Sequence, residues 1–179
     1  NATEAYTLET SSDHAEYANG KLIGKKAGAT RLIAKNADES ITAACDVVVT
    51  PVNIAIGKTA SATSNNGSNT AAKAIDGDML SRWASTYNTG NADDPVVAVN
   101  SITIDLKAVY DLTGINIYWE AAFGKQYEIQ VSDTGEAGSF VTAYKEENGS
   151  QQTSVNFEHA VSGRYVRMQG IKNATKYGY

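Results

Sequence analysis

Oxygen-bearing side chains gather in residues 72–85, where Asp76 and Asp78 flank Gly77 and Ser81 follows three residues later. Calcium takes roughly six to eight oxygen ligands in irregular geometry, and glycine lets the backbone turn sharply between them. The spacing fits a calcium-binding loop. Aspartate and glycine are also the commonest turn residues, so spacing alone leaves open an ordinary solvated turn.

Catalytic motifs do not accompany this stretch. His14 and His159 are the two histidines and fall in different predicted domains, and the sequence has no Gly-x-Ser-x-Gly, His-Glu-x-x-His or phosphate-binding loop. A carboxylate pair of the kind that hydrolyses glycosides stays open, because separation in space is invisible in a sequence. No such pair has a motif around it, so a binding or structural role is favoured over an enzyme.

Composition narrows the class of protein. The 179 residues are 42% hydrophobic and carry a net charge of −5 from 15 basic and 20 acidic residues. This is the composition of a folded protein. With no basic cluster, nucleic acid and anionic membranes are not expected as partners, and no apolar run reaches the roughly 18 residues needed for membrane insertion. Cys45 is the single cysteine and is expected to be a buried core thiol.

Alternating apolar positions predict strands rather than helices. The clearest cover residues 102–106, 115–119 and 127–131, and further strands are expected at 140–144, 154–157 and 165–168. Loops containing Gly135, Gly138, Gly149 and Gly163 would join them. The polar segment 87–100 is long enough to predict a functional or mobile loop, with a neutral insertion as the alternative. Many short strands separated by turns indicate an all-β sandwich or jelly roll.

The first part of the chain carries a motif of its own. Residues 17–30 contain the pattern Asn-Gly-Lys-x-x-Gly-x-x-x-Gly, and Ala-Cys-Asp-Val-Val-Val follows at residues 44–49. These segments resemble bacterial immunoglobulin-like domains of the second group. The resemblance implies that residues 1–50 are the second half of an Ig-like β-sandwich from a longer chain. Pro51 and Val52 form the expected linker, because proline fixes φ and donates no hydrogen bond.

Three later segments point to a second family. They are residues 53–62, residues 74–85 with the Asp-Gly-Asp turn, and residues 127–132 together with 163–168. In order and spacing they resemble the discoidin or coagulation factor C-type domain, in its bacterial form the family 32 carbohydrate-binding module. The resemblance implies an antiparallel jelly roll over residues 53–179, with a last strand expected after Tyr179. Residues 119–127 and 175–179 are similar to modules attached to bacterial β-glucanases and chitosanases.

The same resemblance implies one structural calcium ion in the loop at 72–85. Its ligands would be the backbone carbonyl of Lys73, the carboxylates of Asp76 and Asp78, and the hydroxyl or carbonyl of Ser81. A last acidic ligand would come from the strand expected beyond Tyr179.

A sugar site should lie on the loops at the calcium end. A sugar ring has an apolar face and a rim of hydroxyls, so its site needs aromatic rings beside fixed donors and acceptors. The matching positions, several of which contact ligand in the glucan- and chitosan-binding relatives, are Arg82, Tyr87, Glu120, Tyr177, Tyr179 and, more weakly, Asn66. The structural alternatives are that Arg82 pairs with a carboxylate, that Glu120 is a solvated strand end, and that the tyrosines pack under a loop. Trp83 and Trp119 are expected in the core.

These features predict an all-β chain: a partial Ig-like sandwich at 1–50, a linker at 51–52 and a discoidin-like module at 53–179. The expected function is a non-catalytic, calcium-stabilised carbohydrate-binding module that holds a secreted bacterial polysaccharide-degrading enzyme on a β-glucan, chitosan-like or galactoside glycan. The expected location is secreted or cell-surface. The alternative is a structural or adhesive surface protein that contacts other proteins.

Overall fold

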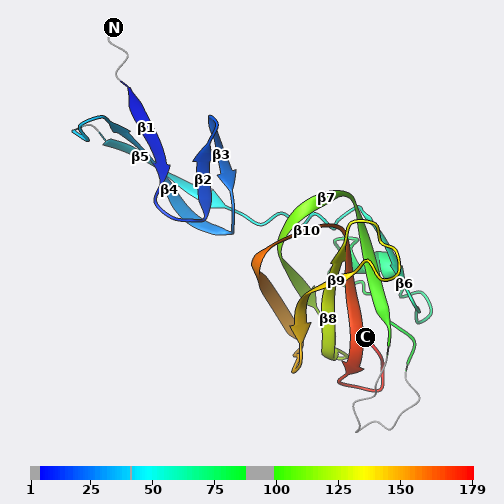
Figure 1. The fold of residues 1–179 in the computed structure, drawn as a ribbon. Coiled ribbons are helices and arrows are strands. Elements are labelled where there is room, and N and C mark those ends of the chain that lie inside the picture. Colours follow the sequence, from blue (N-terminus) through cyan, green and yellow to red (C-terminus); the bar gives the residue numbers. More distant parts are fainter. Residues whose placement is uncertain (1–4, 41, 88–98) are drawn as a thin grey trace. The chain divides into compact units, whose positions relative to one another are not determined.

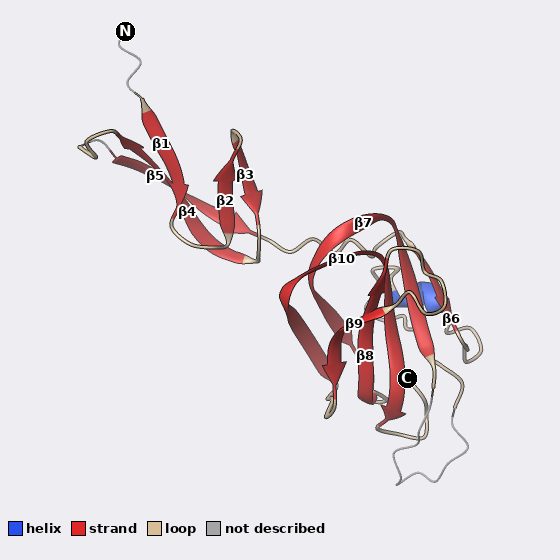
Figure 2. Cartoon of the chain, in the orientation of Figure 1, coloured by secondary structure: helices blue, strands red, loops and turns tan. Residues whose placement is uncertain are grey.

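A computed structural model describes residues 5–40, 42–87 and 99–179. By internal contacts the chain divides into two compact units, Asn1–Asn53 and Ile54–Tyr179. The regular secondary structure of the described residues is almost all strand, as Figure 2 shows, and its one helical element is the short 3-10 helix η1, Ala71–Ala74. None of the described helices is long and apolar enough to cross a membrane.

The first unit contains two small antiparallel sheets. Its strands are β1 (Tyr6–Thr10), β2 (Ala15–Ala18), β3 (Lys21–Gly24), β4 (Gly28–Asn36) and β5 (Thr42–Val49). β1, β4 and β5 form one sheet, and β2 and β3 form a hairpin. Asn19 and Gly20 connect the hairpin with φ values of 53° and 75°, the positive φ that a two-residue type I′ turn requires. The assignment of this unit to an Ig-like domain stays a prediction.

The expectation that Cys45 is buried is wrong, because its side chain is exposed. Cys45 lies on β5 and pairs with Leu32 of β4, and β4 is the only neighbour of β5 in the described sheet. Most of β5 is exposed as well. Small and β-branched residues therefore reflect strand propensity here rather than burial.

The second unit is an antiparallel β-sandwich, which confirms the predicted fold class. Its strands are β6 (Thr59–Ala62), β7 (Ser101–Tyr118), β8 (Gly124–Ser132), β9 (Val141–Glu146) and β10 (Gln152–Asn173). They are hydrogen-bonded in the order β6-β7-β10-β8-β9. β7 and β10 arch over together, so that their two halves contribute to different layers (Figure 1).

The length of these two strands corrects the predicted boundaries. The segments 102–106 and 115–119, expected as separate strands, fall within or just beyond β7, and 154–157 and 165–168 both lie in β10. Gly163, expected in a loop, lies inside β10, where a Cβ atom would meet the Val131 side chain at 2.1 Å. The register shifts near Gly163 and between Asn156 and Val161. Such irregularities bend a strand without ending it, which the sequence pattern alone does not reveal.

The core fills the space between the layers of this unit. Tyr127 and Ile129 from β8 are fully buried and belong to one cluster with Trp83, Leu106 and further apolar residues. Trp119 is partly buried and packs against the same cluster, its ring 5.7 Å from that of Tyr127. Both tryptophans therefore belong to the core, as predicted.

Candidate functional site

Four predicted site residues form two contacting pairs on loops of the second unit. We call Arg82, Tyr87, Glu120 and Tyr177 the loop-end surface. Glu120 lies two residues after β7 and Tyr177 four residues after β10, while Arg82 and Tyr87 belong to the segment that follows the Asp-Gly-Asp turn. All four are exposed, so side chains distant in sequence offer polar groups and aromatic rings to solvent.

Arg82 and Glu120 form the charged half of this surface. Arg82 Nε lies 3.7 Å from Glu120 Oε2, and the two side chains are 50% and 61% exposed. That separation is too long for a hydrogen bond. The predicted pairing of Arg82 with a carboxylate is thus present, yet most of the donors of the guanidinium and the lone pairs of the carboxylate remain open to a ligand.

Tyr87 and Tyr177 form the aromatic half. Their ring centroids are 5.5 Å apart with an interplanar angle of 78°, an edge-to-face contact. This is a favoured geometry for two aromatic rings. Lys176 Nζ lies 5.3 Å from the centroid of the Tyr177 ring. The pair ties the segment after the Asp-Gly-Asp turn to the loop after β10.

Gln151 holds the Glu120 loop in place, a role that sequence reasoning missed. Gln151 Nε2 donates to the Glu120 carbonyl at 3.2 Å, and the Trp119 N–H donates to the Gln151 carbonyl at 3.3 Å. On the other side of the loop, the Ala174 N–H donates to the Phe123 carbonyl at 2.9 Å. No local pattern marks Gln151, because its partners lie about thirty residues away in sequence.

Tyr179 does not lie on the loop-end surface, which corrects its prediction as a ligand contact. It is 4% exposed, and its ring centroid lies 6.4 Å from that of Trp119. Its N–H donates to Ser85 Oγ at 3.0 Å, and the Ser85 N–H donates to its carbonyl at 2.9 Å. A Cβ on Gly170 would meet the Tyr179 ring at 2.3 Å. Tyr179 therefore supports the surface from beneath, and burial raises the pKa of its hydroxyl.

Asn66 is placed by its backbone. Its N–H donates to the Ala84 carbonyl at 2.8 Å, and the Ala84 N–H donates to the Asn69 carbonyl at 3.2 Å. The Trp83 indole N–H donates to the Ser64 carbonyl at 3.0 Å. These bonds fasten the polar loop that contains Asn66 to the segment beside Arg82, and the Asn66 side chain is partly buried.

The predicted calcium loop brings three oxygen atoms together. Ser81 Oγ lies 2.6 Å from Asp76 Oδ2 and 3.1 Å from the Lys73 carbonyl oxygen, and its single proton can be donated to one of them. Gly77 turns the chain with a φ of 83°. Hydrogen bonds from Ser81 and from the Asp78 N–H hold the pKa of Asp76 below its usual value.

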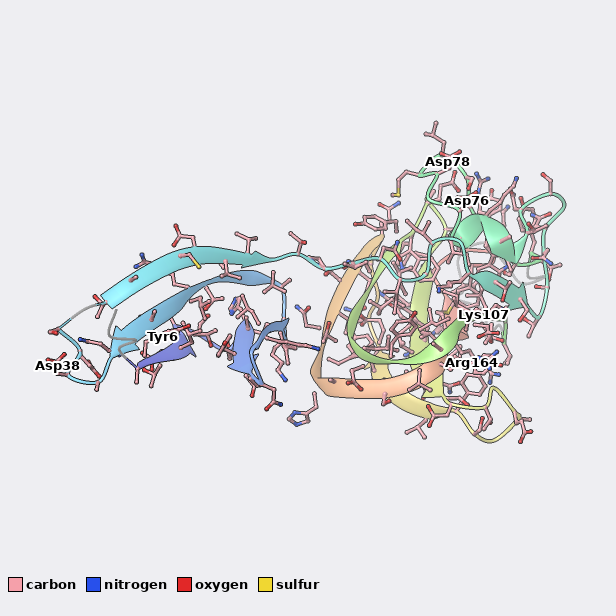
Figure 3. The ribbon with its side chains drawn as sticks, turned by 90° about the horizontal axis from the view of Figure 1, so that it is seen from above. Tyr6, Asp38, Asp76, Asp78, Lys107 and Arg164 are labelled. Carbon is pink, nitrogen blue, oxygen red and sulfur yellow. The ribbon has the colours of Figure 1, made fainter. Side chains whose placement is uncertain are left out.

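Asp78 lies on the same loop, next to Asp76 in Figure 3, but it makes different contacts. Its Oδ1 accepts the Leu80 N–H at 2.9 Å, and its carbonyl accepts the Ser81 N–H at 3.1 Å. Within the described ranges no three His, Cys, Asp or Glu side chains gather as a metal cluster. The donor set is nonetheless all oxygen, from a carbonyl, a carboxylate and a hydroxyl, which is the chemistry that calcium prefers.

The fold and these loops define the class of domain: a two-layer antiparallel β-sandwich that carries exposed polar and aromatic side chains on its loops. Residues 59–179 match the F5/8 type C domain family, and this chain belongs to that family. No curated protein matches the chain.

Solved structures agree with the family. Chitosan-binding module 1 of a chitosanase/glucanase from Paenibacillus sp. IK-5 is 32% identical with a TM-score of 0.63, over 72% of this chain and 93% of that one. Module 2 of the same enzyme, solved with chitotriose, is 27% identical with a TM-score of 0.62, over 71% and 93%. The family 32 carbohydrate-binding module of NanJ from C. perfringens, solved with galactose, is 22% identical with a TM-score of 0.55, over 66% and 85%. The last likeness concerns the fold alone.

Proposed function

We propose that residues 54–179 are a non-catalytic carbohydrate-binding module that holds a glycan at the loop-end surface. The observation that carries this proposal is that predicted site residues distant in sequence form two exposed pairs on the loops, Arg82 with Glu120 and Tyr87 with Tyr177. Membership of the F5/8 type C family and the likeness to two chitosan-binding modules support it.

Each residue has a distinct task in this proposal. The Glu120 carboxylate accepts hydrogen bonds from sugar hydroxyls or from a protonated amine, and the planar Arg82 guanidinium donates to neighbouring hydroxyls. Tyr87 and Tyr177 cover the apolar C–H face of a ring. Gln151 and Tyr179 keep the two loops at a fixed separation, which reduces the entropy lost on binding.

The proposed ligand is a β-glucan or chitosan-like chain, with galactosides as the second choice. The chitosan-binding neighbours are the more similar in sequence, at 27% and 32% identity against 22% for the galactose-bound module. Two aromatic contacts and a few exposed hydrogen bonds predict weak binding, of about millimolar to micromolar affinity. Such a module would gain from multivalency and would hold a secreted bacterial polysaccharide-degrading enzyme on its substrate.

Calcium is proposed as a brace next to this surface. The Lys73 carbonyl, Asp76 and Ser81 would hold the ion, with Asp78 contributing from the same turn. Bound calcium supplies positive charge that fixes these oxygen atoms. Because Ser81 precedes Arg82 directly, a fixed Ser81 restricts the backbone from which the guanidinium extends.

Calorimetry with chitotriose, laminaritriose and galactose tests the glycan proposal. The wild type should bind one of them, and Arg82→Ala and Glu120→Gln should each weaken that binding at least about tenfold, because each removes charged hydrogen bonds. Arg31→Ala is the matched control, since Arg31 forms an exposed pair with Asp46 in the other unit. If no sugar binds but a protein partner does, with affinity unchanged in Arg82→Ala, the structural or adhesive alternative replaces this proposal.

Thermal unfolding with calcium and with a chelator tests the brace. An ion that binds only the folded state adds about 2.7 kcal/mol at a hundred times its dissociation constant, so chelation should lower the melting temperature of this unit. Asp76→Asn should remove that response. Asp38→Asn should keep it, since Asp38 accepts similar hydrogen bonds from Ser40 elsewhere in the chain. A melting temperature identical with and without chelator would contradict the metal.

A further inference from the structure

A shallow hollow lies on the sheet surface of the second unit, away from the residues of the loop-end surface. Its volume is about 130 Å³, and it is lined by Thr59, Ala60, Ser61, Thr103, Asp105 and Tyr165. These residues come from three neighbouring strands, β6, β7 and β10, and the register sets Thr59 and Tyr165 on either side of Asp105. Ile102 and Leu106 on β7 are core residues. Thr103 and Asp105 alternate with apolar neighbours and therefore face outward.

The walls of the hollow are fixed by hydrogen bonds and packing. Arg164 donates to Asp105 through Nε at 2.8 Å and Nη2 at 2.9 Å, and Lys107 donates through Nζ at 3.0 Å and through its N–H at 2.8 Å. Figure 3 shows Lys107 and Arg164 close together and well apart from Asp76 and Asp78. These bonds hold Asp105 in one orientation without help from a ligand.

Tyr165 is held equally firmly. The Arg164 guanidinium lies 4.9 Å from the centroid of its ring. A Cβ on Gly135 would lie 3.0 Å from three of its ring atoms, so the glycine backbone packs directly against it. The ring is thus a preformed apolar wall, so less conformational entropy is lost when a ligand binds.

Hydroxyl groups supply the hydrogen-bonding capacity that remains. In the described part of the chain, Thr59 and Ser61 are exposed and their hydroxyls have no hydrogen-bond partner. Thr103 Oγ1 accepts from Arg167 Nε at 3.2 Å and keeps its own proton to donate. Each hydroxyl can donate one hydrogen bond and accept two. Three hydroxyls beside a fixed ring match the hydroxyl rim and C–H face of a sugar.

Charge decides which sugar fits. The Asp105 carboxylate already faces two cations, Lys107 and Arg164. A further cation would be repelled, so an amino sugar is disfavoured and a neutral one is not. We propose that this hollow is a second binding site, and that it takes one neutral pyranose unit of a glucan chain. The loop-end surface differs, because Glu120 offers a carboxylate with no hydrogen bond from its arginine.

Titration of the labelled whole chain with laminaritriose, followed by ¹H–¹⁵N NMR, tests this proposal. Resonances of residues 59–61, 103 and 165 should shift and approach saturation by about 10 mM, ten times the roughly millimolar dissociation constant expected. Arg82→Ala should leave these shifts unchanged. Chitotriose should not produce them. If the loop-end proposal fails, the resonances of residues 82 and 120 should not shift with any of the glycans. The two proposals are therefore tested by different resonances.

The double variant Thr59→Val with Ser61→Ala removes two hydroxyls without breaking an internal hydrogen bond. It should raise the dissociation constant at the hollow about tenfold, since each hydroxyl contributes a factor of about three or more. Thr113→Val is the matched control, because Thr113 is also an exposed strand threonine and lies outside the hollow. No shift at residues 59–61 and 103 by about 10 mM laminaritriose, or equal affinity in the double variant, would overturn the second site.

Discussion

Two arginine–carboxylate pairs in the same unit behave differently. On the strands, Arg164 reaches Asp105 with two bonds of 2.8 and 2.9 Å, and Asp105 is 17% exposed. On the loops, Arg82 lies 3.7 Å from Glu120, which is 61% exposed. The residue types are nearly the same, but one pair is consumed by internal hydrogen bonds while the other keeps its capacity for a partner.

The difference follows from the secondary structure on which each pair lies, strands for Arg164 and Asp105 and loops for Arg82 and Glu120. Arg164 lies at the irregularity of β10 between Gly163 and Tyr165, beside the Tyr165–Asp105 pairing of the strand ladder, and there it meets Asp105 in a geometry that satisfies both. Loops carry no such ladder: Glu120 is held through its carbonyl by Gln151, whereas the neighbours of Arg82, Ser81 and Ala84, are hydrogen-bonded to other loop residues. A charged pair with unused hydrogen-bonding capacity is therefore the better indicator of a recognition surface than a well-formed salt bridge.

Removing the buried support of the loops should have the largest effect on stability. Tyr179→Ala is expected to lower the free energy of unfolding by about 3 to 5 kcal/mol, because it removes a large buried ring. It should also weaken glycan binding, because the backbone that is hydrogen-bonded to Ser85 loses the packing of that ring beside Trp119. Tyr177→Ala should cost about 1 kcal/mol or less and still reduce binding. Urea unfolding and calorimetry measure both. Equal destabilisation by the two variants would contradict the division into support and surface.

Neutralising the carboxylate of each pair separates their roles. Asp105→Asn should lower the melting temperature by several degrees, because Arg164 and Lys107 lose a charged acceptor. Glu120→Gln should leave the melting temperature nearly unchanged, as expected for an exposed and poorly formed pair, while weakening glycan binding. Differential scanning calorimetry with a glycan titration provides the comparison. A stable Asp105→Asn protein that loses glycan binding at the loop-end surface would reverse the assignment.

Lowering the pH should gradually reduce the stabilisation that the Asp105–Arg164 pair provides. Hydrogen bonds from Arg164 hold the pKa of Asp105 far below its usual value. Since the folded-state pKa lies below the unfolded value of about 3.9, the stabilisation is complete above that pH and is lost as the pH falls further. The difference in urea midpoint between wild type and Asp105→Asn should therefore shrink below about pH 4. A difference that stays constant down to pH 2, roughly, would disprove this origin.

Much of the fold could be predicted because a half-buried strand has a local sequence pattern of alternating apolar and polar residues. Apolar residues at alternate positions, such as Ile102 and Ile104, predicted strands with one inward face. The joining of 154–157 with 165–168 into β10 could not be predicted, because the irregularities near Asn156 and Gly163 depend on pairing with β7. The prediction that Cys45 is buried was wrong for a related reason, since burial depends on which layer covers a strand.

The candidate site, like the fold, could be predicted from the sequence only in part. The sequence indicated Arg82, Tyr87, Glu120 and Tyr177 together with the oxygen-rich turn at Asp76, because residue type and resemblance are properties of the chain itself. It placed Tyr179 on the surface and gave no sign of Gln151.

The sequence by itself determined an all-β chain with an F5/8 type C module and a set of residues able to contact a ligand. Only the tertiary structure decided that Tyr179 turns inward beneath Ser85, that Gln151 anchors Glu120, and that Asp105 is consumed by Arg164. The physical reason is that burial and hydrogen bonding depend on neighbours distant in sequence, and the partners in these three contacts are 31, 59 and 94 residues apart. Distances of that kind are set by the packing of strands and loops and leave no mark on local residue patterns.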